Sequence, residues 1–225
     1  MDIQEALRTR KSIRGYKPDR VPKEIISRVL EVATRAPSAM NTQPWQITVI
    51  AGKVLEEIRR ENVEALNAET VSAQEIIRKP FEGIYRKRQV DLAIQIFQLM
   101  GIGREDKEKR GQWMMRGFRY FDAPAAIVLS LDKSMNSTLA LCDIGVLCQS
   151  ICLAALGFGL GTCIEDQGIL FPDILRKLAG IPESSLPIMC LAIGYPDWEF
   201  PANKLVTPRE ALDNNTRWYG FERPA

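Results

Sequence analysis

The chain has 225 residues, and 30 Lys and Arg against 28 Asp and Glu leave a net charge of +2. A balance so close to zero gives no general attraction to nucleic acid or to a membrane surface. The chain contains no histidine, which excludes Ser-His-Asp and Cys-His nucleophile systems and every zinc site that needs imidazole.

The beginning of the chain predicts two helices and then a strand. Residues 2–10 form a short predicted helix, and a second helix opens at Val21-Pro22, where the missing N–H of proline costs nothing. Its apolar face extends to Ala33, and Pro37 limits its end. Residues 45–51 alternate and then become continuously apolar, which is typical of a strand covered largely on both sides.

A charged amphipathic helix is predicted over residues 53–69, and the chain then stays polar and helical in character from about 70 to 120. The mixed-charge run 104–110 is typical of a solvated helix face. The middle of the chain is therefore expected to be helical.

The second half of the chain contains two nearly continuous apolar runs, residues 125–131 and 186–193. Runs of this length predict interior strands of a sheet with helices on both faces. Residues 139–156 are apolar almost all round, which indicates a helix buried on most sides and covered in part by a second subunit. Asp143 and the glycines that follow the helix argue against a membrane span.

The remainder predicts a strand at 162–166, a helix at 169–179 and a proline-punctuated, polar and aromatic arm over 196–225. Helices and strands are mixed without strict βαβ alternation, so an α+β fold is favoured over a doubly wound one. No linker separates two cores, and we expect one domain over residues 1–225.

Cysteine usage and the N-terminus indicate the cytoplasm. Five cysteines without a CxxC pair fit neither a disulfide framework nor a four-thiolate zinc site. Cys148 and Cys152 lie one helical turn apart in an apolar stretch, which indicates buried, reduced thiols. The first sixteen residues lack the apolar core of a signal peptide.

The basic run at residues 10–16 is the most specific chemical signal. Arg10, Lys11, Ser12 and Arg14 can surround one phosphate, because arginine donates in two parallel bonds, lysine supplies a point charge and serine a short hydroxyl. Taken alone, the run also fits a solvated basic stretch or a nucleic-acid-binding arm.

A second segment, residues 36–45, joins a helix to a strand through small residues between two prolines. Such a loop is stiff, lets a flat ligand approach the backbone and offers Ser38 and Asn41 as hydrogen-bonding partners. An ordinary helix-to-strand connection has the same composition.

A third segment, residues 157–166, begins with Gly157, Gly159 and Gly161. A dinucleotide fingerprint requires glycines after a strand and before a helix, whereas these follow a helix and precede a strand. They indicate a helix C-cap and close helix–strand packing instead.

Taken together, in this order and spacing, RTRKSIRGYKPDRVP, ATRAPSAMNTQPWQ and CDIGVLCQSICLAALGFGLGTCIED resemble the nitroreductase family of FMN-dependent oxidoreductases. The resemblance implies an α+β fold with a central mixed or antiparallel sheet, in an intertwined homodimer with FMN at the subunit interface. It further implies that residues 70–120 carry the helices covering the substrate and that 196–225 pack on the partner subunit.

The resemblance also implies where the cofactor would be bound from one subunit. Arg10 and Ser12 would bind the FMN phosphate, and Lys11 would contact the ribityl chain. Arg14 would lie near N1 and O2 of the flavin and stabilise the negative charge of its reduced form.

Further contacts follow from the same resemblance. Four residues would reach the flavin from the partner subunit, namely Pro37, Ser38, Ala39 and Asn41. Glu165 and Asp166 would present backbone N–H groups to the N5 and O4 edge. Lys204 would add a phosphate contact, and Arg209 is the candidate for a second cation, since Val206 stands where relatives often have arginine.

The implied activity is ping-pong transfer of electrons from NADH or NADPH, through flavin N5, to a nitroaromatic or quinone-like acceptor. The flavin supplies the redox chemistry, so no catalytic side chain and no metal is expected. Phe81, Tyr85 and Trp113 would stack on the aromatic acceptor, although ordinary helix packing also explains each of them.

Three other functions remain open at this point. On the same fold, the covering helices could select a halogenated phenol for reductive dehalogenation. A non-enzymatic protein could store or sense FMN. Nucleic-acid binding is the least supported, because the basic residues do not cluster beyond the N-terminus or interleave with aromatics.

Overall fold

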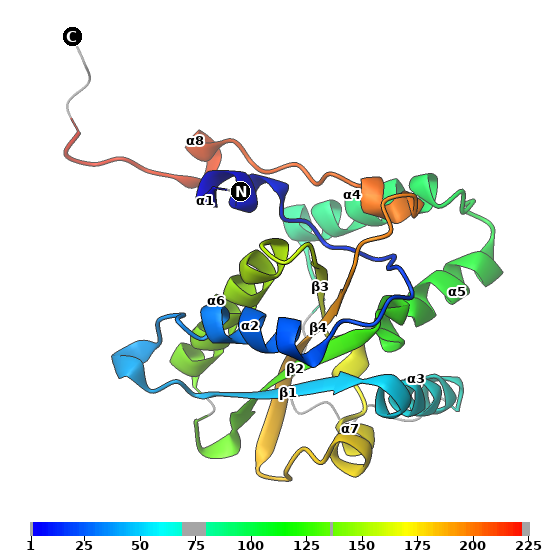
Figure 1. Ribbon diagram of the computed structural model, residues 1–225. Coiled ribbons are helices and arrows are strands. Elements are labelled where there is room, and N and C mark those ends of the chain that lie inside the picture. Colours follow the sequence, from blue (N-terminus) through cyan, green and yellow to red (C-terminus); the bar gives the residue numbers. More distant parts are fainter. Residues whose placement is uncertain (1, 69–79, 136, 222–225) are drawn as a thin grey trace.

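A four-stranded sheet with the strand order β1-β2-β4-β3 runs through the chain and has helices on both faces (Figure 1). The computed structural model describes residues 2–68, 80–135 and 137–221. The strands are β1 (Trp45–Ala51), β2 (Ala125–Asp132), β3 (Gly161–Glu165) and β4 (Ser185–Gly194). Every pairing between them is antiparallel, which confirms the predicted α+β class.

The helices largely follow the predicted ranges. They are α1 (Ile3–Thr9), α2 (Lys23–Ala33), α3 (Gly52–Asn67), α4 (Gly83–Leu99), α5 (Lys107–Phe118), α6 (Thr138–Leu156), α7 (Pro172–Ala179) and α8 (Leu212–Asn215). The predicted helix 169–179 begins only at Pro172, because Gln167–Ile169 forms a separate 3₁₀ turn. Part of the expected helical segment 70–120, residues 70–79, lies outside the described residues.

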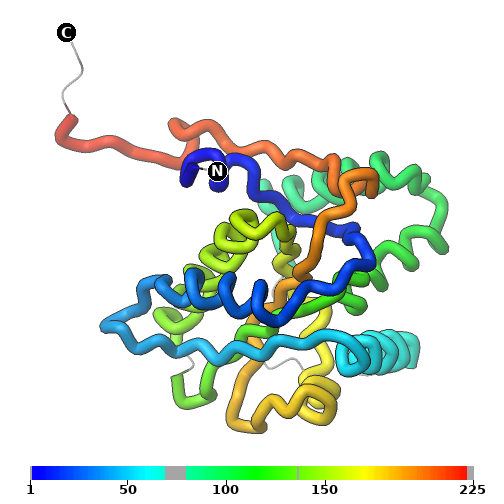
Figure 2. Tube along the Cα trace, viewed as in Figure 1, coloured from blue at the N-terminus to red at the C-terminus, as the bar shows by residue number. Residues whose placement is uncertain are grey.

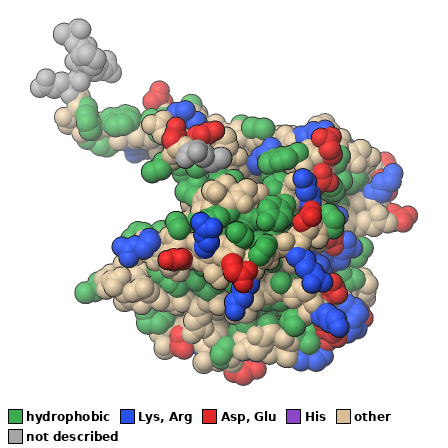
Figure 3. Space-filling view, in the orientation of Figure 1, with side chains coloured by type: hydrophobic (Ala, Val, Ile, Leu, Met, Phe, Trp, Pro, Cys, Tyr) green, Lys and Arg blue, Asp and Glu red, His purple; other side chains and the backbone are tan. Residues whose placement is uncertain are grey.

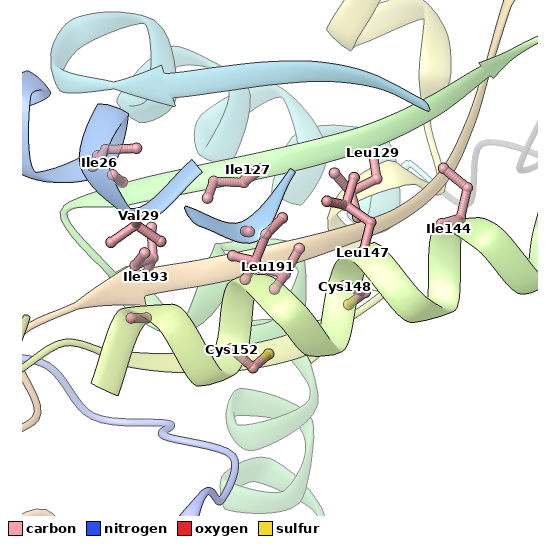
Figure 4. Packing of buried hydrophobic residues seen from close by; sticks show 14 of the residues in the cluster. Ile26, Val29, Ile127, Leu129, Ile144, Leu147, Cys148, Cys152, Leu191 and Ile193 are labelled. Atoms are coloured by element: carbon pink, nitrogen blue, oxygen red, sulfur yellow. The ribbon is translucent and has the colours of Figure 1, made fainter. Parts of the chain in front are cut away.

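One face of the sheet packs against α2 and α6. Alternate residues of β2, including Ile127 and Leu129, point to this face and meet Leu191 of β4 (Figure 4). Leu147 and Ile144 of α6 pack onto them and are fully buried. The period-two alternation of a strand therefore places half of each apolar run in this core.

The opposite face packs against α3 and α7. Ala126 and Val128 of β2 point to this side, where Leu55 and Ile58 of α3 and Leu175 of α7 cover them. Because β2 and β4 lie in the middle of the sheet with helices on both sides, the prediction that their runs are interior strands is confirmed.

Strand β1 corrects one expectation. Residues 45–51 were expected to be covered on both sides, but within the chain only Ile50 of this strand is buried, and Val49 is 42% exposed. The reason is position: β1 is an edge strand that pairs with β2 alone. An apolar run shows that a strand is suited to burial, but not which of its faces the same chain covers.

Helix α6 is buried on one face within the single chain, and its other face is the part that the sequence predicts to be covered by a second subunit. Leu139, Leu141 and Val146 are 66%, 40% and 40% exposed. By length and composition α6 could span a membrane, yet 44% of its apolar window is buried inside the chain. Its buried Asp143 accepts the backbone N–H of Ala39 at 3.2 Å, which explains an acid in so apolar a helix.

The basic segment 10–16 lies against the start of β3 and the chain that follows β4 (Figure 2). Ser12 forms a parallel bridge with Thr162, and the Ile13 N–H donates to the Thr162 carbonyl at 2.9 Å. Gly161 permits this approach, since a Cβ there would lie 2.5 Å from Ile13 Cγ1. The predicted close packing at this glycine is present, but its neighbours are Ile13 and Pro196 and not the helix that was expected.

The substitution Gly161→Ala should therefore destabilise the chain. The new methyl group would overlap Ile13, which is buried and cannot move aside, at a cost of about 1–3 kcal/mol. Urea unfolding of the apoprotein measures this cost. Gly111→Ala is the matched control, because that helical glycine has nothing within 4 Å, and it should be neutral or stabilising by up to about 1 kcal/mol. Equal stability of the two variants would contradict the close approach.

Candidate functional site

A cavity of about 360 Å³ opens between the basic segment, α5 and the end of β3. Its lining combines one cation, aromatic and thioether side chains, and the turn that follows β3. The lining residues are Arg14, Trp113, Met114, Phe121, Cys163, Ile164, Glu165, Asp166, Gln167 and Met189. The structure thus brings Arg14, Glu165, Asp166 and Trp113 together from three distant segments.

The other residues predicted to bind phosphate precede Arg14 and are half-buried: Arg10, Lys11 and Ser12. Hydrogen bonds from Cys148 and Thr162, together with the charge of Arg10, lower the pKa of the Cys152 thiol. Lys11 Nζ lies 5.4 Å from the ring centre of Trp198.

Both backbone polar groups of Arg14 are bound by side chains from remote parts of the chain. Its N–H donates to Asn203 Oδ1 at 2.7 Å, and its carbonyl accepts a bond from an Arg116 guanidinium nitrogen at 3.0 Å. The Arg14 guanidinium lies 6.0 Å from the ring centre of Phe121. Arg14 is therefore fixed at its backbone, and its charged end lies at the pocket.

The turn after β3 is held by a carboxyl group. Glu165 accepts the Gly168 N–H at 3.0 Å and the Cys190 thiol at 2.9 Å. Burial raises the pKa of the Glu165 carboxyl to about 7. The side chain of Glu165 thus bonds inward, while the residue borders the pocket.

Phe121 reaches the pocket from a left-handed turn. Tyr120, Phe121 and Asp122 have φ angles of +53°, +52° and +60°, a conformation that costs roughly 1–2 kcal/mol for each residue other than glycine. The turn is held by side chains: the Tyr120 hydroxyl donates to the Gly168 carbonyl at 2.7 Å, and Arg119 pairs with Asp122 at 2.7 Å. Strain of this kind marks a place where the surroundings dictate the backbone.

The predicted loop Pro37, Ser38, Ala39 and Asn41 lies at the opposite end of β1 from α3 and away from α5 (Figure 1). Asp143 fixes it through Ala39, and Met40 and Asn41 adopt φ angles of +50° and +59°. Within one chain this loop does not line the pocket.

Two of the aromatic candidates also lie elsewhere. Phe81 and Tyr85, before and within the first turns of α4, are 58% and 65% exposed and do not line the pocket, whereas Trp113 does. Among the described residues, no group of three or more Cys, Asp or Glu side chains could hold a metal ion.

The C-terminal cations occupy other hollows. Lys204 is exposed and lines a hollow beside α4 with Gln95 and Leu99. The Arg209 guanidinium bonds to Thr207 and to the Pro208 carbonyl next to it. Arg209 therefore does not join the phosphate-binding candidates in this structure.

The donor set fits a flat ligand with an anionic tail. Cations and a hydroxyl follow one another along residues 10–14, and the last of them, Arg14, lines the pocket together with residues 164–167, Trp113 and Phe121. A cradle of this chemistry suits the phosphate and ring system of FMN.

Sequence reasoning missed two residues that hold this cradle, Asn203 and Arg116, and it missed that Asp143 holds the loop 37–41. Asn203 is buried and directly precedes the predicted Lys204, and Asp143 stands alone in an apolar helix. An acid in such a helix signals a buried partner, but the sequence does not say which one.

Comparisons with known proteins match this chain to one family over most of its length. Residues 7–195 match the model of the Nitroreductase family. The chain is 30% identical to a nitrobenzene nitroreductase of Ectopseudomonas oleovorans, over 95% of each chain. It is 27% identical to the nitroreductase NfnB of Mycolicibacterium smegmatis, over 96% of this chain and 92% of that protein.

Solved structures agree at the level of the fold. An FMN and NADPH-dependent nitroreductase NfnB from Sphigopyxis sp. strain HMH superposes with a TM-score of 0.92 at 27% identity, covering 98% of this chain and 100% of that one. The FMN-dependent NfnB from Mycobacterium smegmatis, in complex with NADPH, gives a TM-score of 0.90 at 26% identity, covering 96% and 97%.

The raised pKa of Glu165 predicts a pH-dependent stability. Between the ordinary value of 4.5 and about 7, the folded chain holds a proton that the unfolded chain has lost, so its free energy of unfolding falls as pH rises. A pKa shift of this size changes the free energy of unfolding by at most roughly 3 kcal/mol across this pH range. Glu165→Gln cannot titrate, so wild type should lose stability relative to the variant across this window.

Urea unfolding of both proteins at about pH 5 and about pH 8 measures the difference, since the two values bracket the titration. Glu199→Gln removes an exposed carboxylate and controls for the change in net charge. A difference between wild type and Glu165→Gln that stays constant with pH would show that the carboxyl is not buried as described.

Proposed function

Because the chain belongs to the nitroreductase family, we propose that it is an FMN-dependent NAD(P)H oxidoreductase that reduces nitroaromatic or related quinone-like acceptors. The observation that carries the proposal is the pocket in which Arg14, the turn after β3 and Trp113 meet. Relatives described as nitrobenzene and FMN-dependent nitroreductases over nearly the full chain support it.

The cofactor would be held along the basic segment. Arg10 and Ser12 would bind its phosphate, with Lys204 as a further cation, and Lys11 would contact the ribityl chain. The backbone N–H groups of Glu165 and Asp166 would face the N5 and O4 edge of the ring at the pocket wall. When bound, FMN accepts two electrons from NADH or NADPH and passes them to the acceptor in a ping-pong cycle.

Arg14 would act electrostatically. Its guanidinium would lie beside N1 and O2, where reduction places negative charge, and a fixed cation there favours the reduced form. The chain needs no nucleophile or metal for this role, since the redox chemistry belongs to the cofactor.

The acceptor would stack on the exposed face of the ring. Trp113 is the best-placed aromatic residue for this contact, because it lines the pocket beside Phe121, with ring centres 6.4 Å apart. Phe81 and Tyr85 are proposed to serve a pocket of the partner subunit, since they are exposed on their own chain.

A homodimer would complete the site. The apolar residues on one face of α6 are exposed in the described part of the chain, as are three aromatic residues of the C-terminal arm, Trp218, Tyr219 and Phe221. Hydrophobic side chains also gather on the surface between the arm and α2 (Figure 3). A second copy would cover these surfaces and bring its loop 37–41 to the flavin.

The same proposal assigns the parts of the chain. Residues 1–225 would form one domain, in which 70–120 cover the substrate and the arm 196–225 packs on the partner subunit. In Figure 1 the arm passes α4 and α1 and then extends away from the sheet. The free cysteines support a reducing, cytoplasmic location.

The donor and the acceptor class follow from the relatives. NADPH is the favoured donor, because both superposed structures are described with NADPH. Nitroaromatic reduction is favoured over dehalogenation of halophenols and over FMN storage, because the relatives are described as nitroreductases.

The direct test is spectroscopic. Purified protein should be yellow, NADPH or NADH should bleach the flavin without oxygen, and nitrobenzene should restore the colour. Protein that does not take up FMN would contradict the cofactor assignment. Bound FMN that no nicotinamide nucleotide reduces would favour a storage protein.

Arg10→Ala should weaken FMN binding by several-fold to a hundredfold, because a charge-assisted phosphate contact contributes roughly 1–3 kcal/mol. Fluorescence titration of the apoprotein with FMN measures the change. Arg8→Ala is the matched control, since Arg8 lies on exposed α1 and bonds only to Gln4 among the described contacts. Equal affinities of both variants would place the phosphate elsewhere.

A further inference from the structure

Arg116 lies where the segment around Arg14, helix α5, the left-handed turn and the C-terminal arm meet. Its guanidinium donates to the Arg14 carbonyl at 3.0 Å and to the Phe121 carbonyl at 3.2 Å, and it pairs with Asp122 at 3.1 Å. The group also lies 4.9 Å from the ring centre of Phe200. One side chain therefore contacts two residues that line the pocket, Arg14 and Phe121.

The opposite side of Arg14 is equally constrained. Asn203 is buried and makes four hydrogen bonds: its oxygen accepts the N–H groups of Arg14 and Gly15, and its amide donates to the carbonyls of Gly15 and Asp197. Arg14 is thus held between Asn203 at its N–H and Arg116 at its carbonyl. Loss of either partner leaves a polar backbone group of Arg14 without its bond.

We propose that Arg116 is a positioning residue that sets the redox potential of the bound flavin by fixing the place of the Arg14 guanidinium. The inference rests on the proposed function, in which Arg14 lies beside N1 and O2. Arg116 touches neither the cofactor nor the acceptor in this arrangement and acts through Arg14.

Arginine is needed for this role because of its geometry. The planar group offers several N–H donors in a fixed fork, so it can serve the Arg14 carbonyl, the Phe121 carbonyl and Asp122 together. A lysine ammonium keeps the charge, but as a compact point charge it cannot reproduce the fork. Comparing arginine with lysine at position 116 therefore separates the effect of holding Arg14 in place from the effect of the positive charge.

Arg119 supplies a matched control. It pairs with the same Asp122, at 2.8 Å and 2.7 Å, and it lies at the same left-handed turn. Among the described residues its side chain bonds to Asp122 and not to Arg14 or Phe121, so Arg119→Met disturbs the turn and its acid without releasing Arg14.

The experiment measures the two-electron midpoint potential of bound FMN, together with the melting temperature of each apoprotein. Arg116→Lys and Arg116→Met should both favour oxidised over reduced FMN by about tenfold, which lowers the potential by about 30 mV. Arg119→Met should retain the wild-type potential. If Arg116→Met does not fold, the lysine variant carries the comparison.

The decisive measurement is the midpoint potential of a double variant that carries changes at both Arg14 and Arg116. In an Arg14→Met background, Arg116→Lys should not lower the potential further, since an effect that acts through Arg14 disappears with it. A second, additive loss would overturn the proposal, because it would show that Arg116 does not act through Arg14. A lysine variant with wild-type potential would also overturn it, because lysine keeps the charge and loses the fork, so the effect would belong to charge at a distance. A loss of equal size in Arg119→Met would assign it to the turn.

The same potentials distinguish failure of the proposed role of Arg14 from failure of the positioning role of Arg116. If Arg14→Met leaves the potential unchanged while FMN still binds, Arg14 does not lie at the reduced ring and the proposed role of Arg14 is wrong. If Arg14→Met lowers the potential and Arg116→Lys does not, only the positioning role of Arg116 is wrong.

Discussion

The backbone of residues 10–16 needs partners outside itself, and the site depends on how they are supplied. The segment forms no helix and adds only isolated bridges to the sheet, yet a polar backbone group removed from water must be bonded. Thr162 bonds Ile13, Asn203 bonds Arg14 and Gly15, and Tyr195 accepts the N–H of Lys17. These bonds fix the course of the segment that carries Arg14, so satisfying the backbone also places the cation that lines the pocket.

On the other side of the pocket from Arg14, the chain contains a strained turn and a buried carboxyl group instead of a cation. The left-handed turn at Tyr120 and the carboxyl of Glu165 both bond to Gly168, from different sides. A side chain at Gly168 would collide with the Tyr120 ring, 2.4 Å away. The strained turn and the buried carboxyl therefore support each other through Gly168, and the rigidity this gives would suit a wall that holds the ring of the proposed cofactor.

Local patterns in the sequence predicted most of the fold, because apolar runs and helical periods depend on neighbouring residues. They placed β2, β4 and α6 and assigned a packing role to Gly161. They did not predict the exposure of β1, since coverage of an edge strand depends on which elements pack nearby. In the site, Arg14 and Trp113 were predicted, but Asn203 and Arg116 were not, because their partners lie 189 and 102 residues away. Long-range polar contacts leave no period in a sequence.

The separation of the loop 37–41 from the pocket has a thermodynamic consequence for the proposed dimer. Asp143 holds that loop on α6, the helix whose exposed apolar face needs cover, so the same helix would form the interface and present the loop to the partner's site. A cofactor that contacts both subunits binds the dimer more tightly than the monomer, and linkage then requires that it stabilise the dimer by the same free energy. In the proposed dimer, an acid that binds this loop from the interface helix would therefore couple assembly of the subunits to occupancy of the site.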